Sequence, residues 1–283
     1  MNLSEQEIDL LKLHYAWPAP YPKLHRYLSY QTGDENFTHS SLKQPADLIE
    51  KLTGLSRLPL LELLLQKGIF PIPYTHPDYP PQLKQLIDPP AVLYTKGNRK
   101  LLKKENLTAI IGARQATSYS VKAMEQIVPP LVANGFVIVS GLAKGADTFA
   151  HEAAIRYGGE TIAVLGNGFF HLYPKENRQL AEQIAAHHLL ITEYPPYHKP
   201  AKWTFPMRNR IISGLSRSLI ITEAAEKSGT MSTIEHALEH GKEVFAVPGP
   251  IDSPLSLGPN RLLNEGATGI WNGFQLIATV VES

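Results

Sequence analysis

The chain has 283 residues, of which 43% are hydrophobic and 19% charged, a composition typical of globular proteins rather than disordered or fibrous ones. Its net charge is only +1, which argues against a uniformly basic nucleic-acid coat, so a nucleic-acid site would need local clustering of charge. The sequence contains no cysteine, which excludes disulfides, thiolate catalysis, zinc fingers and iron–sulfur ligation.

The N-terminal segment lacks the features of a targeting signal. Residues 1–7 carry two glutamates and neither the basic nor the apolar region of a signal peptide. No run of about 18 apolar residues occurs that would span a bilayer. We therefore expect a cytoplasmic protein with no membrane partner.

Residues 1–70 predict a small all-α domain. Apolar residues at helical spacing predict helices over Leu3–Tyr15 and Tyr21–Tyr30, with prolines between them. Two more helices, Ala46–Leu52 and Pro59–Lys67, flank a predicted turn at Gly54. This order is typical of SAM-like or helix–hairpin–helix-like modules. Such a module can bind DNA, bind a protein or serve only as structure, and the sequence leaves these alternatives open.

Residues 71–106 are rich in proline between positions 71 and 90. Apolar residues such as Leu83, Leu86 and Leu93 lie among the prolines and would anchor the segment. This pattern predicts an ordered linker that packs on the larger domain.

Residues 107–283 alternate short apolar runs with helical stretches. Two of these stretches, Val121–Asn134 and Ala146–Tyr157, are each followed by glycine, a common helix stop. Buried strands that alternate with helices predict a doubly wound, mostly parallel sheet. The predicted strands are Thr108–Gly112, Phe136–Ser140, Thr161–Leu165, Leu189–Glu193, Ser218–Thr222 and Glu243–Val247.

Glycines, hydroxyls and cations follow several of these strands. Arg114 and Ser118 follow the first, Ser140, Gly141 and Lys144 the second, and Lys175 the third. Because ligands bind beyond the carboxyl ends of parallel strands, we expect these residues to form one phosphate-binding surface. Neither a Walker motif nor the dinucleotide-binding fingerprint is present.

Residues 194–222 carry five basic side chains and no acidic one. Trp203 and Phe205 lie among these cations, a combination that favours a phosphate backbone with stacked bases. Ser228 and Gly229 follow and open a predicted helix whose free N–H groups can take an anion. The alternatives are that Arg208 and Arg210 are surface helix charges, and that Trp203 and Phe205 are loop anchors that pack on the core.

Catalytic signals are weak, and we predict that the chain is not an enzyme. No nucleophile elbow appears, and Glu193, Glu223 and Glu235 suit either acid–base chemistry or the orientation of Arg208 and Arg210. Asp147 and His151, four residues apart, favour a structural role at a helix start. His236 and His240 have no third ligand in sequence, so neither a metal nor a cofactor is predicted.

A series of unusual strings in residues 79–267 resembles the DNA-processing protein A (DprA/Smf) family. The resemblance covers most of the chain, in order. The strings are Tyr79-Pro80, Asp88-Pro89-Pro90, Leu93-Tyr94-x-Lys96-Gly97, Gly112-x-Arg114, Ser140-Gly141-Leu142-Ala143-Lys144-Gly145-x-Asp147, Ala163-Val164-Leu165-Gly166-x-Gly168, Tyr173-Pro174-x-x-Asn177, Phe205-Pro206-x-Arg208-Asn209-Arg210-Ile211-Ile212, Glu223-Ala224, Ser228-Gly229 and Val247-Pro248-Gly249.

The resemblance implies an extended Rossmann-like core and a role in natural transformation and DNA recombination. Members bind single-stranded DNA, load the RecA recombinase onto it and act as homodimers through the C-terminal part of the core. Phe205 or a neighbouring aromatic would stack a base, and Ser140, Gly141 and Gly229 would donate backbone N–H groups to phosphates. The full set of expected DNA-binding residues is Arg114, Ser118, Ser140, Gly141, Lys144, Lys175, Lys202, Phe205, Arg208, Asn209, Arg210, Ser228 and Gly229.

An enzyme is the rival hypothesis. The string from Ser228 to Glu235 resembles a variant of the glycine-rich motif of the LOG phosphoribohydrolases, which act on nucleoside monophosphates. Glu235 and Arg208 would then cleave the base from the ribose. Serine and methionine replace two glycines of that motif, which narrows the space for a bound ribose.

Overall fold

One nine-stranded sheet organises the computed structural model, which describes residues 2–31 and 44–282. The strands are β1 (Phe70–Pro73), β2 (Val92–Gly97), β3 (Leu107–Ile111), β4 (Val137–Ser140), β5 (Glu160–Val164), β6 (Leu189–Thr192), β7 (Ser218–Ile221), β8 (Glu243–Ala246) and β9 (Thr268–Gly269). The helices are α1 (Glu5–Ala16), α2 (Tyr21–Gln31), α3 (Leu48–Ser56), α4 (Leu60–Gln66), α5 (Ser118–Ala133), α6 (Ala146–Arg156), α7 (Arg178–His187), α8 (Thr204–Leu215), α9 (Gly229–Glu239), α10 (Leu257–Asn264) and α11 (Gly273–Glu282).

The sheet is doubly wound. Its order is β1-β2-β6-β5-β4-β3-β7-β8-β9, and every pair from β6 to β9 is parallel. The chain winds outward from β3 through β4, β5 and β6, then returns to the other side of β3 as β7. The predicted α/β fold is therefore confirmed, and β3–β8 correspond to the six predicted strands.

The proline-rich segment differs from its prediction as a linker. It contributes β1 and β2, which pair antiparallel with each other, and β2 pairs antiparallel with β6. Pro71 and Pro73 lie in β1, an edge strand, where a residue without an N–H breaks no central hydrogen bond. The predicted boundary at residue 106 therefore cuts through a continuous sheet.

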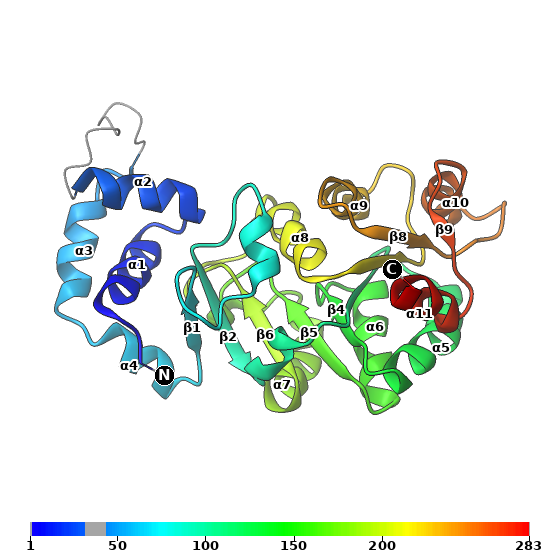
Figure 1. Cartoon of the computed structure of the whole chain (residues 1–283), viewed down its shortest axis with the longest axis horizontal. Coiled ribbons are helices and arrows are strands. Elements are labelled where there is room, and N and C mark those ends of the chain that lie inside the picture. The colour runs from blue at the N-terminus through cyan, green and yellow to red at the C-terminus, as the bar shows by residue number, and fades with distance from the viewer. Residues whose placement is uncertain (1, 32–43, 283) are drawn as a thin grey trace.

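Alternate strand residues face two helical layers. Leu107, Ala109 and Ile111 of β3 belong to a core under α8, α9 and α10, whereas Ile110 belongs to a core under α5, α6 and α11. Figure 1 shows α8 and α9 on one side of the sheet and α5 and α6 on the other. This period-2 pattern fits a sheet covered on both faces.

The helices α1–α4 form a separate cluster at the β1 end of the sheet (Figure 1). A capping box starts α1: the Ser4 hydroxyl accepts from the Glu7 N–H, and the Glu7 carboxylate accepts from the Ser4 N–H. The cluster also includes Val92 and Tyr94 of β2, which attach it to the sheet. The predicted turn at Gly54 was wrong, because α3 continues through it to Ser56.

Within the described ranges, no helix combines the length and the hydropathy needed to cross a bilayer.

Candidate nucleic-acid interface

A cavity of about 540 Å³ opens where the sheet reverses its winding, at the carboxyl ends of β3 and β7. Three segments form most of its lining: the loop from Gly112 to Gln115, the start of α8 and the start of α9. Ala143, Asp147 and Leu255 also contribute. Such a reversal point is where open α/β sheets bind ligands. Of the predicted residues, the cavity brings together Arg114, Phe205, Arg208, Asn209, Ser228 and Gly229.

Close backbone packing holds these segments together. A Cβ atom at Gly112 would lie only 2.6 Å from the Cβ of Ala146 and 2.7 Å from the Thr222 hydroxyl oxygen. Gly145 has a φ of +75°, and a Cβ there would collide with the carbonyl of Ala113. Both positions therefore require glycine, because no side chain fits between the loops.

The buried carboxylate of Glu223 braces the loop that carries Arg114. It accepts from the Thr117 N–H at 2.7 Å, the Thr117 hydroxyl at 2.8 Å and the Ser120 hydroxyl at 2.8 Å. Ser118, the first residue of α5, stays exposed beside this brace. Glu223 thus positions a loop, a use that the sequence hypotheses for this residue did not include.

The N-terminus of α9 faces the cavity. No acidic residue occupies its first turn, and Gly229 and Thr230 line the cavity wall. The buried Ser228 hydroxyl oxygen has no hydrogen-bond partner among the residues that the structure describes. Asn209 reaches this end of the helix through the Ser232 hydroxyl at 3.3 Å. A helix start of this kind attracts anions through its N–H groups and its dipole.

A cation and two aromatic rings meet at the cavity, and three exposed lysines lie close in sequence to residues of this group or of the cavity lining. The Arg114 guanidinium lies 5.6 Å from the Phe205 ring centroid, a cation–π contact, and the Tyr173 ring lies 5.5 Å from the Phe205 ring. Sequence reasoning missed Tyr173, although its position two residues before Lys175 placed an aromatic beside a predicted phosphate contact. We call Arg114, Lys144, Lys175, Lys202, Phe205 and Tyr173 the rim.

The lysines of the rim differ in their partners. Lys144 pairs with Glu176 at 2.6 Å, and both side chains are exposed. No carboxylate in the described part of the chain lies within ion-pair distance of Lys175 or Lys202, and both are exposed. Lys175 and Lys202 are therefore the lysines most available to a phosphate.

Arg208 is inside the protein rather than on its surface. Its side chain is 4% exposed, and Nη1 donates to the carbonyls of Gly141, at 2.5 Å, and of Val164. Burial lowers the pKa of Arg208 to about 10; Asp147 opposes this shift and Arg114 adds to it. The guanidinium thus holds two strand-end loops together. Its burial is at odds with two of the sequence hypotheses: that Arg208 is a charge on the surface of a helix, and that it contacts a phosphate.

Ser140 and Gly141 also use their polar groups internally. The Ser140 hydroxyl donates to the Ile110 carbonyl at 2.6 Å, and the Gly141 N–H donates to Asp147 at 3.1 Å. Burial raises the pKa of Asp147, whereas the positive charge of Arg208 and the hydrogen bond from the Gly141 N–H favour its charged form. Because Asp147 accepts from the Gly141 N–H and Ser140 is fully buried, we do not retain Ser140 and Gly141 as phosphate donors.

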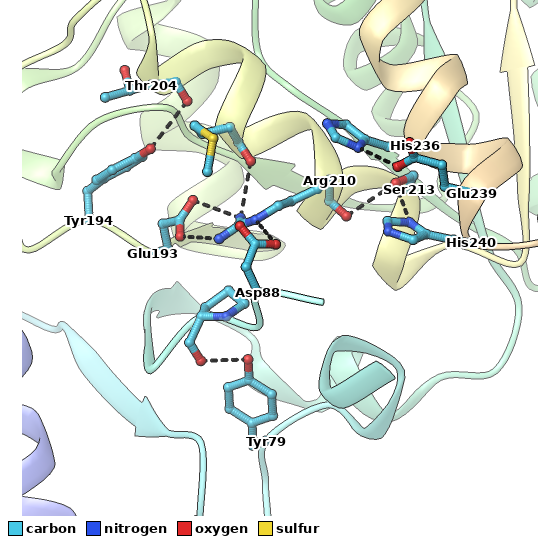
Figure 2. Close-up of polar contacts among 12 residues, drawn as sticks. Tyr79, Asp88, Glu193, Tyr194, Thr204, Arg210, Ser213, His236, Glu239 and His240 are labelled. Atoms are coloured by element: carbon cyan, nitrogen blue, oxygen red, sulfur yellow. Dashed lines mark hydrogen bonds and ion pairs between the residues drawn. The ribbon is translucent and has the colours of Figure 1, made fainter. Parts of the chain in front are cut away.

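Arg210 belongs to a second internal network. Figure 2 shows its guanidinium between two carboxylates: Glu193 accepts at 2.9 and 2.7 Å and Asp88 at 2.9 Å. Arg210 is 3% exposed. Burial disfavours its charge, but Glu193 and Asp88 raise the pKa of Arg210 overall. The ion pairs tie α8 to β6 and to the proline-rich segment, so a DNA contact by Arg210 is not expected either.

The histidines singled out from sequence have structural contacts. His151 is buried and its Nδ1 lies 2.6 Å from the Thr161 hydroxyl, while Asp147 accepts backbone N–H groups as the structural alternative predicted. His236 lies 3.4 Å from Glu239, and His240 lies 2.9 Å from the Ser213 hydroxyl (Figure 2). Among the described residues, no group of three potential metal ligands occurs.

Comparisons with known proteins place the chain in a family. Residues 71–281 match the family described as DNA recombination-mediator protein A. The DNA processing protein DprA of Bacillus subtilis is 45% identical over 227 residues, which cover 80% of this chain and 76% of that protein. Its counterpart in Streptococcus pneumoniae is 45% identical over 200 residues, 71% of this chain and 70% of that one.

Two solved structures are also similar. The X-ray structure of DNA processing protein A from Streptococcus pneumoniae superposes with a TM-score of 0.81 at 36% identity, covering 98% of each chain. The protein from Helicobacter pylori, whose structure is described as giving insight into a unique single-stranded DNA binding mode, has a TM-score of 0.69 at 35% identity over 76% of this chain and 96% of that one. The chain therefore belongs to the DNA recombination-mediator protein A family, whose curated members are named DNA processing protein DprA and Smf.

Proposed function

We propose that the chain binds single-stranded DNA along the rim, without catalysing a reaction on it. The observation that carries this proposal is the Arg114 guanidinium lying over the Phe205 ring, beside a cavity that the start of α9 lines. The single-stranded DNA binding described for the Helicobacter pylori relative supports the same assignment.

The proposed contacts divide into charge and stacking. Arg114, Lys175 and Lys202 neutralise phosphates, so affinity falls as salt rises. Phe205 and Tyr173 offer faces on which bases of any sequence can stack, so base preference is weak. The α9 N-terminus, with Ser228 and Gly229, receives one phosphate through backbone N–H groups.

The test is a fluorescence-anisotropy titration of a labelled dT oligomer across a salt series, with the wild type and an Arg114→Ala/Lys175→Ala variant. We expect the variant to lose affinity and its log K to fall less steeply with log salt, by about 0.7 per lost phosphate contact. Lys122→Ala is the control, because Lys122 is exposed on α5, on the opposite face of the sheet from α8. Equal binding by all three proteins would refute the assignment.

We further propose that DNA bound on the rim is delivered to the RecA recombinase during natural transformation. The support is membership of the DNA recombination-mediator family. RecA assembly on single-stranded DNA, followed by its DNA-dependent ATPase, should be faster with the wild type than with Arg114→Ala/Lys175→Ala. No acceleration by the wild type would contradict RecA loading but leave DNA binding intact.

Self-association is proposed through the C-terminal part of the core. Trp271 and Phe274, at the start of α11, are 66% and 62% exposed, whereas Ile270 and Leu276 beside them are buried in the core. Exposed aromatic residues of this size are typical of interfaces. Sedimentation analysis of Trp271→Ser/Phe274→Ser should give a monomer where the wild type gives a dimer; equal masses would exclude this surface.

The phosphoribohydrolase alternative gains no support from the geometry. Glu235 is exposed and does not line the cavity, while Arg208 is committed to the carbonyls of Gly141 and Val164. The acid and the cation that such a reaction needs are therefore not assembled at one place.

A further inference from the structure

A second cavity, of about 500 Å³, lies between α2 and the segment that joins β1 to β2. No rim residue lines it. Its lining comes from two regions: Tyr21, Pro22, His25 and Arg26 of α2, and Tyr74, Lys84, Leu86, Ile87 and Pro89 of the joining segment. We call these nine residues the groove.

Stacked aromatic rings form one wall of the groove. The rings of Tyr21 and Tyr74 are 3.8 Å apart and nearly parallel, at 13°. The Lys84 ammonium lies 5.1 Å from the Tyr74 centroid, and the His25 ring lies 5.4 Å from that of Tyr21. Two chain segments that are distant in sequence thus meet through aromatic and cation–π contacts, with a positive charge at the opening.

Two basic side chains, Arg26 and Lys84, line the groove. Arg26 and Lys84 are exposed, and no carboxylate in the described ranges lies within ion-pair distance of either. The nearby acidic side chains of the joining segment are already paired, Asp78 with Lys103 and Asp88 with Arg210. Unpaired cations beside stacked rings suit a ligand with both phosphate and flat base.

An apolar side chain extends this surface. Ile87 is 93% exposed at the groove, although it lies between the buried Leu86 and the ion-paired Asp88. A large aliphatic side chain that is exposed to solvent beside basic side chains provides an apolar face against which a base can pack.

The groove is held rigidly and shares its scaffold with the rim. The Tyr21 N–H donates to the Pro89 carbonyl at 2.9 Å, which ties α2 to the joining segment. One residue earlier, Asp88 binds Arg210 on α8, the helix that also carries Phe205. In Figure 1 the start of α2, the joining segment and α8 follow one another along the same side of the molecule.

We propose that the groove is a second contact for single-stranded DNA, which holds a strand continuing beyond the rim. Lys84 and Arg26 take backbone phosphates, and the Tyr21–Tyr74 wall with Ile87 receives a base. A cavity of this size accommodates one or two nucleotides. The inference rests on the proposed function of the rim and assigns to the N-terminal helices a DNA-binding role.

The test compares a short dT oligomer of about six nucleotides with one of about 20 nucleotides, because only the longer strand can occupy both contacts. Lys84→Glu should weaken binding of the longer oligomer about tenfold and change the short one far less. The matched control is Lys122→Glu, which reverses one exposed charge on the far face. Lys84→Arg should restore binding, since it keeps the charge.

A second readout locates the strand directly. A dT oligomer carrying photoreactive 4-thiothymidines is cross-linked to the wild type and the modified peptides are identified by mass spectrometry. We expect adducts on peptides containing Tyr21, Tyr74 or Lys84 with the longer oligomer, in addition to those at Phe205 or Tyr173.

The outcomes separate the two proposals. Binding of both oligomers with no effect of Lys84→Glu, and adducts at the rim alone, would overturn the groove and leave the rim assignment standing. Binding of neither oligomer would refute the rim and with it the groove. Equal losses for Lys84→Glu and Lys122→Glu would mean a general charge effect and would also overturn the inference.

Discussion

The basic residues of the 199–210 stretch fall into two groups that the sequence alone makes look alike. Lys199 and Lys202 are exposed, whereas Arg208 and Arg210 are buried and bound to carbonyl and carboxylate oxygens of the same chain. One basic stretch thus supplies both exposed cations, which belong to the proposed DNA contact, and buried arginines that hold neighbouring loops together.

The largest expected effect is on stability, from Arg210→Ala. This change leaves Glu193, 8% exposed, without its bidentate partner, and loss of one member of a buried ion pair costs about 3–5 kcal/mol. Urea unfolding followed by tryptophan fluorescence should report this loss in the free energy of unfolding. Lys202→Ala, the exposed counterpart, should change it by less than about 0.5 kcal/mol. Similar losses of unfolding free energy for both variants would contradict the distinction between buried and exposed basic residues.

The next effect is a loss of folding stability in mild acid. It involves one buried histidine in the N-terminal helices, His14, and one in the core, His151. Burial lowers the pKa of His14 and of His151 to about 3, and His198 adds to the shift at His14. In the unfolded chain a histidine gains its proton near pH 6.5, so stability is full above that pH and falls as pH drops from 6.5 towards 3. The loss is about 1.4 kcal/mol per histidine at pH 5.5.

Urea titrations at pH 7.5 and 5.5 measure this loss. His151→Asn removes one of these groups and should reduce the difference between the two pH values by about 1.4 kcal/mol. An amide can keep the contact with Thr161. His187→Asn is the control, since His187 is exposed. A wild-type stability that does not change between these pH values would contradict the account.

On the exposed side, Phe205→Leu should weaken binding of single-stranded DNA by about 1–3 kcal/mol while the salt dependence stays unchanged. The reason is that the variant loses stacking but no charge. Arg114→Lys tests the same contact from the other partner: it keeps the charge but loses the planar group that lies over Phe205. Anisotropy titrations at several salt concentrations separate the two effects. A changed salt slope for Phe205→Leu would show that its role is not stacking.

The smallest effect is expected at Lys144, whose charge Glu176 already neutralises at 2.6 Å. The pKa of Glu176 is lowered, mainly by its hydrogen bond to Lys144, so the pair is charged at neutral pH. Glu176→Gln should free Lys144 and strengthen DNA binding only slightly, because exposed ion pairs are weak. Unchanged binding by Glu176→Gln would place Lys144 outside the interface.

Much of the fold could be predicted from sequence. Short apolar runs between helical stretches located β3–β8, because buried parallel strands leave this pattern. The same reasoning failed for β1 and β2, because prolines that normally exclude strands are tolerated at the sheet edge.

The site was predicted in part, and its errors share a physical cause. The strand-end rule located Arg114 and the start of α9, which both line the cavity, at one edge of the sheet. It could not foresee that Arg208 is buried, because the Gly141 carbonyl that it binds lies 67 residues away. Asp88, which binds Arg210, is 122 residues from it. Burial of a charge depends on such distant partners, and local composition does not report them.

The most direct test of the contrast measures Arg114→Ala and Arg210→Ala side by side, for both the urea midpoint and the affinity of the folded protein for a dT oligomer. We predict that Arg114→Ala keeps the wild-type midpoint and loses affinity, while Arg210→Ala lowers the midpoint and largely retains affinity. An Arg210→Ala protein that unfolds like the wild type but binds DNA poorly would contradict the account, because it would place this buried arginine on the DNA.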